Sequence, residues 1–183
     1  MNYAIHYTKK GILNLPEPYS DWMSHEHTLA VLCDADFSGC PFSRRSTSGW
    51  IAYYWGNVIS FGTIKQKSNA TSSTVAEVLA LLETMKEICW TVDLLKDLRL
   101  DPEEIYLFCD SKPAIEQCKH PTQHRNTRHY ENTLFFLRQS LTDLKINLEH
   151  IATDYNVADF LTKPLERTRF NKLLTNVFVN KKV

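Results

Sequence analysis

The chain has 183 residues, 43 % of them hydrophobic and 23 % charged, a composition that is typical of a globular protein and excludes a disordered one. No apolar run approaches the length of a membrane-spanning helix, and the first residues lack the apolar core of a signal peptide. Positive and negative side chains balance at 21 each, so a nucleic-acid partner would have to be bound by local basic patches. The five cysteines form no CxxC pair, which favours reduced thiols in an intracellular protein.

The first part of the chain predicts an irregular segment followed by three strands. Prolines and a glycine interrupt any periodicity over residues 1–28. The strand-like runs that follow are rich in apolar, β-branched and aromatic residues, and a polar loop over residues 38–48 separates the first from the second. These runs are Thr28–Phe37, Trp50–Trp55 and Val58–Ile64. Gly56-Asn57 is a two-residue turn of the kind that closes a hairpin, so we expect the last two strands to pair.

The strongest helical pattern follows these strands. Apolar residues recur at steps of three and four, with one turn skipped near Cys89. They are Val75, Leu79, Leu82, Met85, Val92 and Leu95. The segment Thr74-Val-Ala-Glu77 has the spacing of a capping box, which predicts that the helix begins there and that Glu77 closes its first turn.

The rest of the chain alternates between strands and helices. A short helix is predicted after Asp110, and Pro164 ends or kinks a later one. The other predicted strands are Ile105–Cys109 and Ile146–Ala152, and the other helices are Tyr130–Leu144, Val157–Leu161 and Arg167–Phe178. A meander of strands followed by β–α–β alternation predicts an α/β fold, with a mixed sheet flanked by helices.

Four acidic residues stand where such a sheet would present them at its rim: Asp34, Glu77, Asp110 and Asp159. Converging carboxylates repel one another unless cations lie between them, and clustered oxygen ligands suit Mg²⁺ or Mn²⁺. Two such ions about 4 Å apart can activate a water and stabilise the leaving oxygen of a phosphodiester. Each acid taken alone is more typical of a turn or a helix cap. Strand alternation also places Asp36 on the same face as Asp34, so spacing does not choose between them.

Several short segments, taken in order, carry a resemblance to one known family. They are CDADFSG from Cys33, RRSTSGW from Arg44, SSTVAE from Ser72, CDSKPAI from Cys109, HRNTRHYE from His124 and ADFLTKPL from Ala158. In this order and at this spacing they resemble the ribonuclease H domain of copia-type retrotransposon polyproteins. The chain departs from the family's pattern at Val75, Val78 and Ser111, but it keeps all four acids.

The resemblance implies a ribonuclease H-like fold, in which a five-stranded mixed sheet carries helices on both faces. It also implies an endonuclease that hydrolyses the RNA strand of RNA–DNA hybrids during reverse transcription. The family's acidic positions fall on Asp34, in preference to Asp36, and on Glu77, Asp110 and Asp159. These four residues would be both the catalytic residues and the ligands of two Mg²⁺ ions, which Mn²⁺ can replace.

The hybrid is expected to be recognised by its shape and its 2′-hydroxyl groups, without reading of the bases. The candidates for phosphate contacts are Arg44, Arg45, Arg125, Arg128 and His129. His150 lies where some ribonucleases H carry a mobile histidine that helps the product leave. A half-buried strand histidine is the plainer interpretation of that residue.

HYTKKGI, from His6 to Ile12, resembles the end of the segment that joins reverse transcriptase to ribonuclease H, so residues 1–28 would be a remnant of that segment. Residues 29–165 would then form the ribonuclease H domain, and residues 166–183 a C-terminal helix or tail. The expected partners are the hybrid and the reverse transcriptase part of the same polyprotein, with no membrane, in the cytoplasm (in a virus-like particle) or the nucleus. Two alternatives stay open: a catalytically silent or domesticated domain that binds nucleic acid or scaffolds a polyprotein, and a DNA-cutting nuclease of the same fold class.

Overall fold

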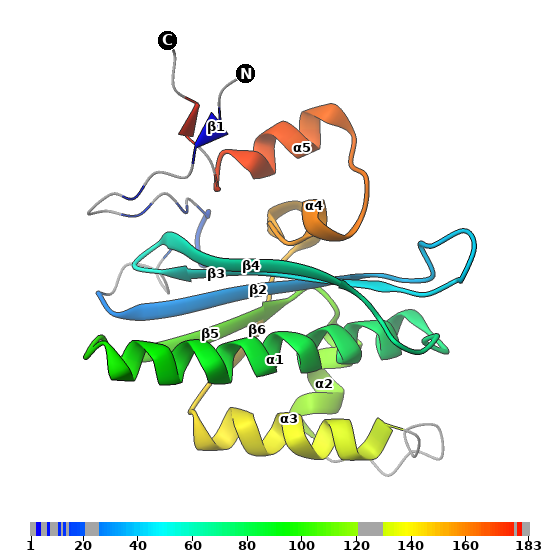
Figure 1. Cartoon of the computed structure of the whole chain (residues 1–183), viewed down its shortest axis with the longest axis horizontal. Coiled ribbons are helices and arrows are strands. Elements are labelled where there is room, and N and C mark those ends of the chain that lie inside the picture. Colours follow the sequence, from blue (N-terminus) through cyan, green and yellow to red (C-terminus); the bar gives the residue numbers. More distant parts are fainter. Residues whose placement is uncertain are drawn as a thin grey trace.

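The chain folds around a five-stranded mixed sheet (Figure 1). A computed structural model describes residues 3–4, 7, 11, 13, 15–20, 26–120, 130–177 and 179–180. The strands lie in the order β4-β3-β2-β5-β6, with β2 antiparallel to β3 and parallel to β5. Their bounds are Thr28–Asp36 for β2, Thr47–Tyr54 for β3, Asn57–Lys65 for β4, Glu104–Cys109 for β5 and Asn147–His150 for β6.

Helices cover both sides of this sheet (Figure 1). Those on one side are α1 (Ser73–Asp97), α2 (Lys112–Lys119) and α3 (Glu131–Asp143). Those on the other side are α4 (Asp159–Thr162) and α5 (Arg167–Leu174). A short 3₁₀ turn, Thr153–Tyr155, precedes α4. This layering confirms the predicted α/β fold, a mixed sheet with helices on both faces.

The central strand β2 separates two apolar cores, because its side chains alternate between the two faces of the sheet. Leu29, Val31 and Cys33 belong to the core that α1 covers, whereas Ala30 and Leu32 belong to the core on the α4 side. A strand that is buried on both faces needs an almost continuous apolar sequence, which explains why this run is apolar until it reaches its acids.

The capping box predicted at the start of α1 is wrong. Ser72 is the N-cap, and its hydroxyl accepts a hydrogen bond from the Val75 amide at 3.2 Å. The helix therefore begins at Ser73, and Glu77 lies in the second turn, where its side chain is buried. The neighbouring Ser72, Ser73 and Thr74 are all good caps, and local spacing does not rank them.

The hairpin between β3 and β4 turns one residue earlier than predicted. Tyr54 pairs with Asn57, so the two turn residues are Trp55 and Gly56, with φ of 52° and 63°. Positive φ at both positions matches the twist of the flanking strands. Asn57 begins β4, and its amide Nδ2 donates a hydrogen bond to the Trp55 carbonyl at 2.9 Å.

The two ends of the chain meet, because β1 (Tyr3–Ala4) pairs antiparallel with β7 (Val179–Asn180). Leu15, in the segment predicted to be irregular, is buried in the core on the α4 side together with Val177. Helix α5 ends at Leu174, earlier than the predicted end. Within the described part of the chain, no helix has the length and apolar character needed to cross a membrane.

Candidate active site

Pairing of parallel strands brings two of the four acids together. Strands β2 and β5 run parallel in a register that pairs Cys33 with Cys109. Asp34 and Asp110 are the next residues along each strand, so both lie at the same end of the sheet. Asp34 is almost fully buried, whereas Asp110 is partly exposed.

Asp159 reaches this point from the α4 side of the sheet, as the first residue of that helix, and it is fully buried. Asn156 anchors the turn before α4. Its Nδ2 donates a hydrogen bond to the Cys33 carbonyl at 2.9 Å, and its Oδ1 accepts one from the Ala158 amide at 3.2 Å. The turn that carries Asp159 is therefore tied directly to the end of β2.

Gly49 on β3 allows α4 to pack closely against the sheet. It pairs with Asp34, and a Cβ added to it would lie 2.7 Å from Cγ2 of Thr162, closer than side chains pack. The Thr162 hydroxyl donates a hydrogen bond to Oδ2 of Asp34. The missing side chain at Gly49 thus lets α4 contact the acid on β2.

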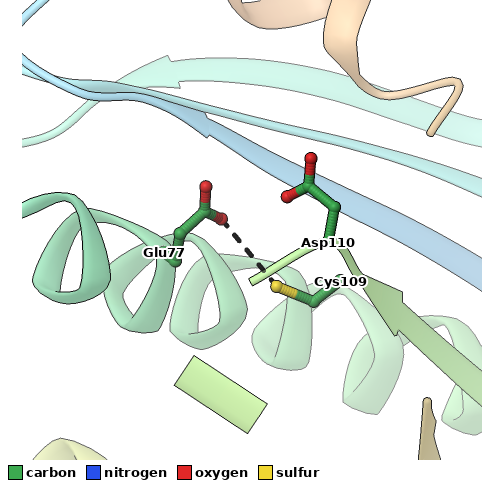
Figure 2. Close-up of side chains that lie close together, drawn as sticks. All are labelled: Glu77, Cys109 and Asp110. Atoms are coloured by element: carbon green, nitrogen blue, oxygen red, sulfur yellow. Dashed lines mark hydrogen bonds between the residues drawn. The ribbon is translucent and has the colours of Figure 1, made fainter. Parts of the chain in front are cut away.

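The four acids form two overlapping groups, and Asp110 belongs to both. Carboxylate oxygens of Asp34, Asp110 and Asp159 lie within 4.8 Å of one another, and so do ligand atoms of Glu77, Cys109 and Asp110. Figure 2 shows Glu77, carried by α1, near Asp110 and the Cys109 thiol, which donates to Oε2 of Glu77 at 3.9 Å. Asp110 therefore links the acids on the two sides of the sheet.

Two basic side chains lie against the same carboxylates. Lys163 Nζ is 2.7 Å from Oδ1 of Asp159 and 3.7 Å from Oδ2 of Asp34. Arg169 on α5 pairs with Oδ2 of Asp159 and donates a second hydrogen bond to the Thr153 carbonyl at 2.7 Å. The chain itself thus compensates part of the negative charge of the cluster.

The acids differ in how strongly they hold their protons. Burial raises the pKa of Glu77 to about 10, and repulsion from Cys109 and Asp34 adds to the effect. Burial, and then repulsion from Asp159, raise the pKa of Asp34 to about 7, although Lys163 acts in the opposite direction. Burial acts to lower the pKa of Lys163, but Asp34 and Asp159 outweigh it and raise that pKa. In the metal-free protein, Glu77 is therefore protonated at neutral pH and Asp34 is partly protonated.

The donor atoms suit a hard divalent cation. Carboxylate oxygens are the ligands that Mg²⁺ and Mn²⁺ prefer, whereas the Cys109 sulfur is a softer donor. Oδ1 of Asp159 is buried and accepts no well-angled hydrogen bond, although Lys163 Nζ is 2.7 Å away. Burial is the first cause of the raised pKa values of Asp34 and Glu77, and repulsion from neighbouring acidic groups raises both further. The residues present therefore fit divalent cations.

The remaining predicted site residues lie at the end of β2, in the loop after it, or outside the described residues. Asp36 joins neither acidic group of the described chain. A Cβ added to Gly39 would lie 1.6 Å from Oδ2 of Asp36, so this carboxylate turns back over its own loop. Arg44 and Arg45 are exposed in the same loop, between β2 and β3. The residues outside the described part are Arg125, Arg128 and His129.

Several described residues that contact or position the acids are absent from the sequence prediction: Thr153, Asn156, Thr162, Lys163 and Arg169. Lys163 follows Asp159 by four residues, which is the helical spacing that pairs an acid with a base, so a local signal for it exists. No such signal links Asn156 to Cys33 or Arg169 to Asp159, because each pair joins two different elements. His150 ends β6 beside Cys109, and its role stays a prediction.

Replacing Asn156 by alanine is expected to lower the free energy of unfolding by about 1–3 kcal/mol. Asn156 is fully buried, and its removal leaves the Cys33 carbonyl and the Ala158 amide without the partner that it provides. Urea unfolding of the two proteins measures the difference. The matched control is Asn132→Ala at an exposed position of α3, where we expect a change below about 0.5 kcal/mol. Equal stability of the two variants would contradict this role of Asn156.

Comparison with known proteins places the chain among retrotransposon sequences. No family model matches it. It is 35 % identical over 137 residues to the retrovirus-related Pol polyprotein from transposon TNT 1-94 of Nicotiana tabacum. The aligned region covers 75 % of this chain and 10 % of that protein. It is 32 % identical over 156 residues to the retrovirus-related Pol polyprotein from transposon RE1 of Arabidopsis thaliana. This second aligned region covers 84 % of this chain and 11 % of that protein. The chain thus spans about a tenth of the length of these relatives.

Solved structures agree with the fold. LC11-RNase H1, isolated from compost, superposes with a TM-score of 0.57 at 17 % identity, over 81 % of this chain and 99 % of that one. The structure of the same enzyme in complex with an RNA/DNA hybrid superposes with a TM-score of 0.56 at 15 % identity. This superposition covers 73 % of this chain and 93 % of that one. This likeness confirms the ribonuclease H-like fold that the sequence motifs implied. Together with the Pol relatives, it identifies the chain as a ribonuclease H-fold domain of the Ty1/copia-type Pol polyprotein family.

Proposed function

We propose that this domain is a metal-dependent endonuclease that hydrolyses the RNA strand of RNA–DNA hybrids during retrotransposon reverse transcription. The observation that carries the proposal is the convergence of Asp34, Asp110 and Asp159, with Glu77 joined to them through Asp110. The relatives of the chain are Pol polyproteins, and the compost enzyme with the same fold has been solved with an RNA/DNA hybrid. Both facts support a hybrid as the substrate.

The four acids are the proposed ligands of two divalent ions, Mg²⁺ or Mn²⁺. When bound, the ions would activate a water and stabilise the charge that develops in an in-line displacement at phosphorus. The residues around the acids orient them for this task. The Thr162 hydroxyl donates to Asp34, and the Thr153 hydroxyl donates to Oδ2 of Asp110 at 2.9 Å. Such hydrogen bonds hold a carboxylate in one orientation and leave its other lone pairs for a metal.

Basic side chains at the same end of the sheet as the acids are the proposed contacts for phosphates. Arg44 and Arg45 project from the loop between β2 and β3, which starts three residues beyond Asp34. Lys65 ends β4, and its Nζ donates to Sγ of Cys40 in the same loop at 3.0 Å. Exposed basic residues at the acidic end of the sheet would bind the backbone of the hybrid without reading its sequence. Further proposed contacts, from a local basic patch in the sequence, are Arg125, Arg128 and His129.

The proposed context is a larger polyprotein. Since the relatives are about ten times longer than the chain, we propose the reverse transcriptase part of the same polyprotein as its partner. Residues 1–28 would then be the end of the connection to that part, residues 29–165 the nuclease domain, and residues 166–183 a C-terminal extension. The proposed place of action is the cytoplasm, within a virus-like particle, or the nucleus.

Cleavage of a strand-labelled RNA–DNA hybrid tests the proposed function. We expect the RNA strand to be cut in Mg²⁺ or Mn²⁺ and to stay intact in EDTA, because the acids act through bound cations. An RNA duplex and a DNA duplex of the same sequence serve as matched substrates and should stay intact. Denaturing gels resolve which strand is cut in each case.

Two outcomes would contradict the proposal. Cleavage of the DNA duplex would favour a DNA-cutting nuclease of the same fold class. A folded protein that cuts none of the substrates in Mn²⁺, even with its polymerase partner supplied, would favour the catalytically silent domain.

A further inference from the structure

Lys163 lies between two carboxylates that come from different elements. Its Nζ is 2.7 Å from Oδ1 of Asp159 on α4 and 3.7 Å from Oδ2 of Asp34 on β2. An ion that bridged these two acids would have to occupy the same space, because a divalent ion binds carboxylate oxygens at about 2.0–2.2 Å. The Lys163 ammonium group therefore occupies the position of a cation that Asp34 and Asp159 would bind together.

The surroundings of these ion pairs make the contacts strong. The side chains of Asp34 and Asp159 are 2 % and 0 % exposed, and that of Lys163 is 31 % exposed. Charges so far removed from water interact more strongly than charges on the surface. A divalent ion placed on Asp159 would repel the Lys163 ammonium just as strongly, so the two cannot share that position.

Arg169, the second basic residue, is held differently. Besides its pair with Asp159, it donates a hydrogen bond to the Thr153 carbonyl at 2.7 Å. Lys163 is the C-cap residue of α4, and its flexible four-carbon side chain extends from there to the acids. When a cation enters, Lys163 can swing out toward solvent, whereas Arg169 keeps an anchor outside the acidic cluster.

We propose that Lys163 is an exchangeable internal counter-ion: it occupies the space between Asp34 and Asp159 in the metal-free protein, and a divalent ion enters by displacing it. The inference rests on the proposed function, because it concerns the same carboxylates. It explains how two buried acids fold side by side without a metal. It also implies that the chain lowers its own affinity for metal, since each ion that binds has to replace Lys163.

Calorimetric titration of the whole chain with Mn²⁺ tests the inference through binding, independently of catalysis. The variant Lys163→Met should bind Mn²⁺ with a dissociation constant about tenfold lower than that of the unaltered protein, because the competing charge is gone. Lys163→Arg, which keeps the charge, should stay within about twofold of the unaltered protein. The matched control Lys172→Met removes a charge from α5 that lies over the Tyr155 ring, and it should also have little effect.

The outcomes separate this inference from the function on which it rests. The inference is wrong if Lys163→Met binds Mn²⁺ as well as the unaltered protein does, or more weakly. Either result would leave the proposed metal site uncontradicted, because both proteins would still bind the ion. If neither protein binds Mn²⁺, the proposed function fails and the inference fails with it.

A second measurement covers the case in which Lys163→Met does not fold without metal. In the unaltered protein labelled with ¹⁵N-lysine, the Lys163 ammonium should exchange its protons slowly while two carboxylates hold it. Saturation with diamagnetic Mg²⁺ should make this exchange fast. An ammonium signal that stays unchanged at saturation would overturn the inference.

Discussion

Asp110→Asn is expected to lower the rate of RNA-strand cleavage by more than about 100-fold while the protein stays folded. Asp110 is the one acid that belongs to both groups of potential ligands in the described chain, so its loss affects both proposed ion positions. An amide keeps the shape of the side chain but removes the charge that attracts a cation. Asp110 is partly exposed, so the substitution should cost little stability. Single-turnover cleavage of a labelled hybrid measures the rate, and circular dichroism checks the fold.

The matched control for this experiment is Asp36→Asn. Asp36 lies two residues beyond Asp34 on the same strand, but its carboxylate lies against Gly39 and it belongs to neither acidic group of the described chain. We expect this variant to keep its rate within about twofold. A strong loss in Asp36→Asn together with full activity in Asp110→Asn would show that the acids have been assigned wrongly.

In the metal-free protein, Glu77→Gln is expected to raise the free energy of unfolding at pH 8 by up to about 5 kcal/mol. Burial raises the pKa of Glu77 from its ordinary value of 4.5 to about 10, so the folded protein keeps this carboxyl group protonated at pH 8. The unfolded chain releases the same proton, and this release favours unfolding. Glutamine has nearly the same shape and no proton to release, so the variant avoids this loss.

The sign of the pH dependence follows from the raised pKa. Between about pH 4.5 and 10 the folded protein binds more protons at Glu77 than the unfolded chain does, so stability falls as the pH rises through this range. The gain in the free energy of unfolding that Glu77→Gln brings should therefore be near zero at pH 4 and should grow toward pH 8. Asp34, whose pKa is about 7, adds a similar loss that is common to both proteins.

Urea unfolding in EDTA at pH 4, 6 and 8 measures this dependence. Glu83→Gln is the matched control, since Glu83 lies on the same helix but pairs with Lys86 at the surface. The Glu83→Gln substitution should change the free energy of unfolding by less than about 0.5 kcal/mol at each pH. If the difference between Glu77→Gln and the unaltered protein did not change with pH, the raised pKa of Glu77 would be refuted.

The sequence by itself determined the order of the main strands and helices and predicted the four acids. Strand and helix patterns depend on neighbours within a few residues, so Thr28–Phe37 and Ile105–Cys109 were recognisable as strands without tertiary information. Each of the four acids was a candidate because it follows or precedes an apolar run, and the resemblance to the copia-type family favoured Asp34 over Asp36. Local patterns were less reliable at the boundaries, where several residues compete for one role, as Ser72 and Thr74 do for the cap of α1.

Only the tertiary structure decided that these acids meet and what surrounds them. Asp34 and Asp110 are neighbours because β2 and β5 pair in one particular register, and a shift of one residue would have moved them to opposite faces. Asp159 joins them through the contacts of Asn156 with β2, and Arg169 reaches Asp159 from a separate helix. These contacts join residues far apart in the chain, and their free energy depends on packing and burial that no local pattern encodes.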